Sequence, residues 1–233
     1  MSIDRAEPAL TVDDAIRTRR SIRRFLPTPV TAQTLHELLA LAARAPSGTN
    51  VQPWRTYVLA GKEKDALAQA IIAKYRSSGE ESKDFEYYPR EWLEPWISRR
   101  RKVGADLYGL LEITKGDKEK MLAQWTRNYL FFDAPVGLIF TIDRVFGPGM
   151  LLDYGMFMEN LMLAARARGL DTCPQAAFAD FPETIATTLG LPENERVICG
   201  MSLGYADPAA PENTLHTERA AVETFADFRG FSA

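Results

Sequence analysis

The residues best suited to carry chemistry form a basic cluster near the start of the chain. Five arginines and Ser21 lie within residues 17–24 (Arg17, Arg19, Arg20, Arg23 and Arg24). A guanidinium group binds phosphate oxygens through two parallel hydrogen bonds, and a serine hydroxyl can add a neutral one. A solvated basic helix end, stabilised by the helix dipole, would have the same composition. The cluster by itself leaves both interpretations open.

A second candidate segment, residues 45–54, joins an apolar helix pattern to a strand pattern. Its sequence, APSGTNVQPW, places short polar side chains beside glycine and proline. Such a segment can present backbone and side-chain hydrogen bonds to a planar heterocycle. An ordinary helix-to-strand connection is also rich in these turn residues, so two interpretations stay open here as well.

Other patterns argue against several kinds of site. Neither His36 nor His216 has a carboxylate or cysteine at ligand spacing, so we expect no metal site. The glycines follow neither the dinucleotide-fold nor the P-loop spacing. Cys173 and Cys199 are too few to staple a fold, and we expect them to pack in the core rather than act as nucleophiles.

Composition narrows the class of protein. The chain has 233 residues, of which 46% are hydrophobic and 25% charged, values typical of a globular protein rather than a disordered, collagen-like or disulfide-rich one. The formal charge of −3 gives no electrostatic reason to expect nucleic acid or an anionic membrane as a partner. Residues 1–10 contain no apolar run, so we expect no signal peptide and a cytoplasmic protein.

Hydrophobic periodicity and capping residues predict the elements that must position these groups. Helices are expected at 11–18, between a cap at Thr31 or Thr34 and Pro46, at 62–75, at 151–169, and from a cap at Asp180 to Gly190. Strands are expected at 55–60, 136–142 and 197–205, the second of them apolar on both faces and therefore central. Interleaved helices and strands indicate an α/β or α+β class.

Two further regions embellish what we interpret as one domain over residues 1–233. Residues 77–128 look like a helical excursion over the core, and residues 206–233 form a poorly periodic tail with three phenylalanines. Aromatic residues of the excursion could line the floor of a substrate pocket, or they could simply anchor the excursion to the core (Tyr87, Tyr88, Trp92 and Trp96). The basic run 99–102 is most simply a solvated turn, although it could attract phosphates of a nicotinamide cofactor.

Four ordered blocks of the sequence together resemble the nitroreductase family of flavoproteins. The blocks are RRSIRRF at 19–25, PSGTNVQPW at 46–54, GLDTCPQAAF at 169–178, and GYAD at 204–207 followed by Arg219. The likeness covers nearly the whole chain. It implies an α+β, three-layer α/β/α fold with a central mixed, mainly antiparallel sheet and an intertwined homodimer. The apolar helix at 151–169 would be the dimer seam, with a buried core helix of a monomer as the alternative, and the tail would wrap over the partner.

The resemblance also implies a tightly bound flavin mononucleotide (FMN). Arg19 and Arg219 would clasp its phosphate, with Arg20 and Ser21 near the ribityl and ring oxygens. Arg23 would face the pyrimidine edge, where a positive charge favours the reduced ring. The family usually has a second basic residue two positions before Arg219, where this chain has a threonine, so a looser grip on the phosphate is implied.

Residues farther along the chain would meet the ring itself. Pro174 and Gln175 would pack along it, the Ala176 backbone amide would address the flavin N5 position, and Ala177 would lie beside it. The family often has an acidic residue and a glycine where this chain has two alanines, although a backbone donor survives that change. Asn128 would face the flavin from the end of the excursion.

The remaining site residues would act across the dimer. Pro46, Ser47 and Asn50 would reach the flavin bound mainly by the other subunit.

The activity implied is oxidation of NADH or NADPH and reduction of nitroaromatics, quinones or similar flat acceptors. It would follow a ping-pong cycle in which no side chain acts as the catalyst. Three alternatives stay open: a flavin or enone reductase, a flavin-binding or flavin-fragmenting protein that does not turn over nicotinamide, and an interaction protein that kept only the fold.

Overall fold

A four-stranded sheet forms the centre of the computed structural model, which describes residues 7–8, 11–81 and 83–231. Its strands are β1 (Arg55–Ala60), β2 (Val136–Asp143), β3 (Asp171–Gln175) and β4 (Glu195–Gly204), in the order β1-β2-β4-β3. All three strand pairings are antiparallel. An isolated parallel bridge between Ser21 and Thr172 adds the N-terminal chain beside β3. The mainly antiparallel sheet that the family resemblance implied is therefore confirmed, and the isolated bridge is its one parallel pairing in the described residues.

Seven α-helices and five short 3-10 turns surround the sheet in the described residues. The helices are α1 (Val12–Thr18), α2 (Ala32–Ala42), α3 (Gly61–Ser78), α4 (Trp96–Leu110), α5 (Lys118–Thr126), α6 (Met150–Arg166) and α7 (Pro182–Leu189). The 3-10 turns are η1 (Gly48–Asn50), η2 (Phe131–Asp133), η3 (Ala176–Asp180), η4 (Pro211–Thr214) and η5 (Val222–Thr224). None of the helices in the described ranges is long and apolar enough to cross a bilayer.

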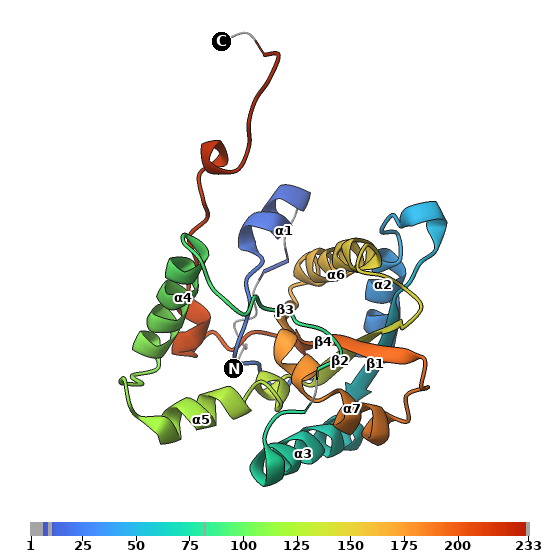
Figure 1. Ribbon diagram of the computed structural model, residues 1–233, viewed down its shortest axis with the longest axis vertical. Helices are drawn as coiled ribbons and strands as arrows, with labels where there is room; N and C mark the ends of the chain where they lie inside the picture. The colour runs from blue at the N-terminus through green and yellow to red at the C-terminus, as the bar shows by residue number, and fades with distance from the viewer. Residues whose placement is uncertain (1–6, 9–10, 82, 232–233) are drawn as a thin grey trace.

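The sheet lies between two helical layers, as Figure 1 shows. Strand β2 is buried on both faces, so its alternate side chains enter different cores. Leu138 and Phe140 pack with α2 and α6, whereas Ile139 belongs to the core beneath α3 and α7. The α+β, three-layer expectation is confirmed, with β2 in the central position predicted from its apolar sequence.

Local signals in the sequence explain most element boundaries. The side chain of Thr11 accepts a hydrogen bond from the Asp14 backbone N–H and caps α1, and Thr31 caps α2 in the same way. Gly190 ends α7 in the left-handed conformation that glycine adopts most readily. The prediction that Asp180 caps α7 was wrong: Phe181 occupies that position, while Asp180 forms an ion pair with Lys83. Helix α6 ends at Arg166, three residues before the predicted stop at Gly169.

Strand β3 was not predicted as a strand because its five residues include Asp171 and Pro174. Proline cannot donate to a ladder, so it is tolerated where one side of a strand lacks a full partner. This position fits, because β3 is an outer strand of the four and pairs along one side with β4.

Residues 77–128 and the C-terminal tail lie differently relative to the sheet. Helices α4 and α5 fall within residues 77–128 and lie at the left of the sheet in Figure 1. The C-terminal chain rises past α4 and away from the other elements in the same view. Its three phenylalanines, Phe225, Phe228 and Phe231, are each more than two-thirds exposed.

Two glycines allow aromatic rings to pack directly on the sheet. A Cβ at Gly137 would lie 2.6 Å from the Phe131 ring, and one at Gly200 would collide with the Phe178 ring. These two rings stack with centroids 4.6 Å apart. Phe178 is part of η3, so the missing side chain at Gly200 lets η3 lie close against β4.

We predict that Gly200→Ala lowers the free energy of unfolding by about 1–3 kcal/mol, because the added methyl group displaces Phe178 from a filled core. Urea denaturation followed by circular dichroism measures the change. Gly104→Ala is the matched control, since its Cβ meets nothing within 4 Å and alanine favours helix by up to about 1 kcal/mol. Equal stabilities of the two variants would contradict this account.

Candidate functional site

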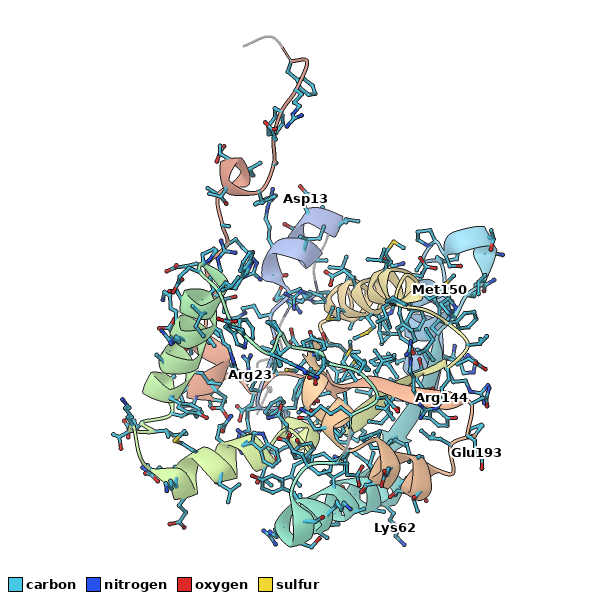
Figure 2. All side chains as sticks on the ribbon, in the orientation of Figure 1. Asp13, Arg23, Lys62, Arg144, Met150 and Glu193 are labelled. Atoms are coloured by element: carbon cyan, nitrogen blue, oxygen red, sulfur yellow. The ribbon has the colours of Figure 1, made fainter. Side chains whose placement is uncertain are left out.

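Six of the residues predicted to form a site line one cavity of about 440 Å³. We call it the Arg23 cavity, and the six are Arg23, Asn128, Pro174, Gln175, Ala176 and Ala177. They come from the N-terminal chain, the end of the excursion, β3 and η3. Figure 2 shows Arg23 in the middle of the molecule, between α4 and the sheet. The fold thus joins three segments that lie far apart in the sequence.

Pairing with β3 fixes Arg23 in the cavity wall. Ser21 bridges to Thr172, and the Ile22 N–H donates to the Thr172 carbonyl at 3.1 Å. The Arg23 N–H donates to Asn213 Oδ1 at 2.8 Å, and its Nη1 donates to the Ser21 carbonyl at 3.1 Å. The guanidinium is therefore held by its own backbone turn and has further N–H groups available for a ligand.

The floor of the cavity carries backbone donors. The η3 turn begins at Ala176, and the side chain of its N-cap residue, Gln175, makes no capping hydrogen bond. The first N–H groups of a helical turn have no partner within it, so those of Ala176 and Ala177 are available at the cavity. Both residues have only a methyl side chain, which leaves room for a flat group to approach the backbone.

A buried hydrogen-bond chain supports this floor from below. Ser202 Oγ donates to Gln175 Oε1, and Gln175 Nε2 donates to the Asn128 carbonyl, each at 2.6 Å. Asn128 Nδ2 in turn donates to the Trp125 carbonyl at 3.1 Å. The Gln175 amide is occupied on both sides, so its role is to fix Asn128 against β3 and β4. The predicted packing of Gln175 along a ring stays a prediction.

Both cysteines are buried and neutral at physiological pH. Burial raises the pKa of the Cys173 thiol to about 11 and that of the Cys199 thiol to about 12. Cys173 lines the Arg23 cavity, but a neutral thiol is a weak nucleophile. The expectation that these residues pack rather than react agrees with their surroundings.

The residues predicted to bind a phosphate are not brought together within one chain. Arg19 Nε lies 3.9 Å from Glu159 of α6. Arg20 Nη1 donates to the Asn213 carbonyl at 3.0 Å and lies 3.0 Å from His216 Nε2. Arg219 is exposed and donates to oxygens of its own segment. A joint role for Arg19 and Arg219 therefore stays a prediction.

The predicted cross-subunit residues also lie outside the Arg23 cavity. Pro46, Ser47 and Asn50 belong to the turn around η1, which Gly48 joins to α6 by donating its N–H to Asp153 Oδ2 at 3.0 Å. Figure 1 places this turn on the opposite side of α6 from α4. Their contact with a second subunit stays a prediction.

One buried network was missed by the sequence reasoning. Glu212 is 1% exposed and accepts from Arg127 Nη1 at 2.6 Å and from Arg24 Nε at 3.4 Å. Both arginines also contact Asp133 Oδ2, at 2.9 and 3.0 Å. Burial opposes ionisation of Glu212, but its own backbone N–H and Arg127 outweigh it and lower the pKa. No local pattern links these residues, because they are scattered along the chain.

Aromatic residues of the excursion cover the Arg23 cavity. Phe85, Tyr87 and Tyr88 line it, and Phe85 and Tyr87 also line a neighbouring apolar cavity of about 430 Å³ against α6. Burial raises the pKa of Tyr87 above its ordinary value. Of the four aromatic residues named from the sequence, Tyr87 and Tyr88 thus border the site, whereas Trp96 is exposed at the start of α4.

Three charged contacts fasten the chain that carries these rings. The Glu81 carboxylate accepts hydrogen bonds from the Glu183 N–H at 2.8 Å, the Thr184 N–H at 3.1 Å and the Thr184 hydroxyl at 2.6 Å. Glu81 therefore caps the start of α7. Lys83 Nζ lies 2.7 Å from Asp180 Oδ1.

The third contact is a two-pronged ion pair. Arg144 donates to both oxygens of Asp84, at 2.8 and 3.0 Å, and its Nε donates to the Glu193 carbonyl at 3.1 Å. Arg144 follows the end of β2, so the pair ties the excursion to the sheet. Bidentate geometry holds a segment more firmly than a single contact does.

Comparison with known proteins gives one consistent result. The family model described as the nitroreductase family matches residues 16–205. A 4-nitrobenzoate reductase of Nocardioides sp. is 41% identical, over 96% of this chain and 92% of that protein, and a nitrobenzene nitroreductase of Ectopseudomonas oleovorans is 38% identical, over 93% and 96%. The crystal structure of the FMN and NADPH-dependent nitroreductase NfnB from sphigopyxis sp. strain HMH superposes with a TM-score of 0.92 at 36% identity, covering 95% of this chain and 100% of that one.

We predict that Glu81→Ala lowers the free energy of unfolding by about 1–3 kcal/mol, because it leaves the donors at the start of α7 without an acceptor. It should also speed proteolysis within residues 83–95. Glu86→Ala is the control: in the part of the chain that the structure describes, the one ion pair of Glu86 is with the exposed Arg90, at 3.8 Å, and its loss should cost less than about 0.5 kcal/mol. Denaturation and timed digestion of both variants provide the measurements, and equal protease resistance would contradict the anchoring role.

Proposed function

This chain belongs to the nitroreductase family, and on that premise we propose that it is an FMN-dependent NAD(P)H oxidoreductase that reduces nitroaromatic and similar flat acceptors. The observation that carries the proposal is the convergence of six predicted flavin contacts on the Arg23 cavity. The curated relatives are named for nitroaromatic reduction, and the NfnB structure for FMN and NADPH. Quinones are included as acceptors of the same flat shape.

The donors of the Arg23 cavity suit the edge of a flavin ring. They comprise a guanidinium with free N–H groups, at Arg23, and two uncapped backbone amides, at Ala176 and Ala177. A flavin presents its ring nitrogens and carbonyl oxygens along one edge, which such donors complement. FMN, when bound, supplies the hydride chemistry that nicotinamide oxidation and acceptor reduction require.

The chain itself would contribute orientation and charge. Arg23 would offset the negative charge that the ring gains on reduction, and the Ala176 amide would orient the ring by donating to it. Gln175 would hold Asn128 in position through its two internal hydrogen bonds. Phe85 and Tyr87 would restrict water at the open side. None of these residues needs to exchange a covalent bond with the substrate, which suits a ping-pong cycle.

We further propose a homodimer that joins along α6. The outward side of α6 carries Leu152, Met156 and the half-buried Leu163, at helical spacing, and Leu152 is 74% exposed. In such a dimer, Pro46, Ser47 and Asn50 would reach the flavin of the other subunit. The exposed phenylalanines of the tail would find cover there too, and Arg219 would approach a phosphate beside Arg19.

The domain and cell compartment follow as further parts of the proposal. We take residues 1–233 as one flavin-binding domain, with residues 77–128 as its covering excursion and residues 206–233 as the dimer-wrapping tail. The two buried, unpaired cysteines favour the reducing cytoplasm.

We predict that the purified chain binds FMN, that anaerobic NADPH or NADH bleaches the flavin spectrum, and that nitrobenzene or a quinone restores it. Arg23→Met should slow bleaching about tenfold or more, because it removes the charge that offsets reduction. Arg17→Met is the control, since the exposed Arg17 contacts only Asp13 of its own helix in the described residues. Stopped-flow absorbance measures both variants.

The possible failures point to different alternatives. A chain that binds no FMN would refute the proposal. Bound flavin that nicotinamide does not bleach would favour a non-reductase flavoprotein. Rapid turnover of free flavin or enones, with slow turnover of nitroaromatics and quinones, would favour those acceptors instead.

We also predict that Leu152→Glu combined with Met156→Glu converts a dimer to a monomer and lowers the FMN content, because two buried carboxylates would oppose association. Light scattering after size exclusion, with flavin absorbance per chain, measures both. Leu122→Glu, on the exposed side of α5, is the control. A dimer that survives the double substitution would contradict the α6 seam.

A further inference from the structure

The charges of the Arg23 cavity do not cancel. Five charged residues line it, three basic and two acidic, so their formal charges sum to +1. Lys83 contacts both acidic residues, lying 2.7 Å from Asp180 Oδ1 and 3.4 Å from Glu80 Oε2. The other two are Arg23 and Arg100. In the described part of the chain, neither forms an ion pair with a carboxylate. The cavity therefore presents two guanidinium groups, those of the half-buried Arg23 and the exposed Arg100, that can bind the anionic group of a ligand.

Arg100 is held in place by aromatic rings rather than by acidic groups. Its guanidinium carbon lies 4.7 Å from the centre of the Trp92 ring and 5.5 Å from that of Tyr88. These two rings lie 5.5 Å apart. A guanidinium stacked on a ring keeps its N–H groups directed sideways in its own plane, where they can grip a carboxylate with two hydrogen bonds.

Arg100 differs in this respect from its basic neighbours. The run 99–102 lies within α4, which begins at Trp96, rather than forming the solvated turn that we expected. Arg99 and Lys102 line a groove beside the tail, and Lys102 is paired with Asp106 at 2.8 Å and Glu218 at 3.6 Å. Of the residues in this run, only Arg100 lines the cavity.

We propose that Arg100 is an anion receptor that binds the carboxylate of an aromatic acceptor while the acceptor ring lies in the Arg23 cavity against the flavin held at Pro174–Ala177. This inference rests on the proposed function and deepens it, because it names the acceptor as a flat aromatic acid. Arg23 serves the flavin edge, which leaves Arg100 for the second ligand. The ion pair with Arg100 would strengthen the binding of acceptors that carry a carboxylate. It would not change the affinity for neutral acceptors of the same shape.

Nicotinamide phosphates are the other anions that could reach Arg100, and the ping-pong cycle allows the two sources to be tested separately. Flavin reduction by NADPH and by NADH is timed alone, and reoxidation is then timed with 4-nitrobenzoate and with the neutral isostere 4-nitrobenzamide. Arg100→Met removes the charge at similar length, and Arg100→Lys keeps the charge without the fork. Arg101→Met is the control, because Arg101 is exposed and lines neither the cavity nor the tail groove in the described residues.

We expect Arg100→Met to raise the KM for 4-nitrobenzoate about tenfold to a hundredfold, with kcat nearly unchanged, and to change the KM for 4-nitrobenzamide less than about twofold. Arg100→Lys should restore part of the loss. Equal effects on the two acceptors would overturn the proposal, and so would slower flavin reduction by NADPH with the acceptor preference unchanged.

A binding measurement separates this inference from the proposed function. Calorimetric titration of the FMN-loaded chain with benzoate and with benzamide needs no turnover. Tighter binding of benzoate that disappears in Arg100→Met would support the anion receptor even if nicotinamide failed to reduce the flavin. Equal binding of the two ligands by the unaltered chain would refute it even if nitrobenzene reduction were fast.

Discussion

The close contact of Phe178 with the backbone of Gly200 is the constraint on which the site depends. Because β4 has no side chain at this position, a buried ring can lie flat on the sheet and bring η3 with it. The backbone amides of Ala176 and Ala177, which directly follow β3, then line the cavity. Pairing of Ser21 with Thr172 brings Arg23 to the same edge. Hydrophobic packing thus sets the geometry, and the polar groups add the chemistry.

Charged residues of the chain fall into two groups with different uses. Those that fasten segments have partners at short range, such as Arg144 with Asp84 and Arg127 with Glu212. Those that face the cavity without a carboxylate, Arg23 and Arg100, are oriented by a carbonyl or by aromatic rings. Orientation without neutralisation keeps the positive potential available to ligands. The net charge of the chain gives no indication of this local excess.

Sequence reasoning could predict what short-range rules determine. Caps such as Thr11 and Gly190 act within a few residues, and the central position of β2 follows from its continuous apolar sequence. Family resemblance added the residues that meet at the Arg23 cavity. Contacts across long separations could not be predicted, because no local pattern connects Glu212 with Arg24, or Asp84 with Arg144. Two neighbouring arginines of the N-terminal cluster therefore have different surroundings. Arg24 contacts Glu212 and Asp133, whereas Arg23 lines the Arg23 cavity.

The burial of Cys173 and Cys199 has a consequence for an enzyme that handles electrophiles. Burial raises the pKa of the Cys173 thiol to about 11 and that of the Cys199 thiol to about 12, so both side chains stay protonated at neutral pH. Nitroso compounds and quinones consume thiolates, so a protein that generates or binds such molecules beside an ionised cysteine would alkylate itself. Here both thiols are buried and protonated, which makes them poor targets for such electrophiles.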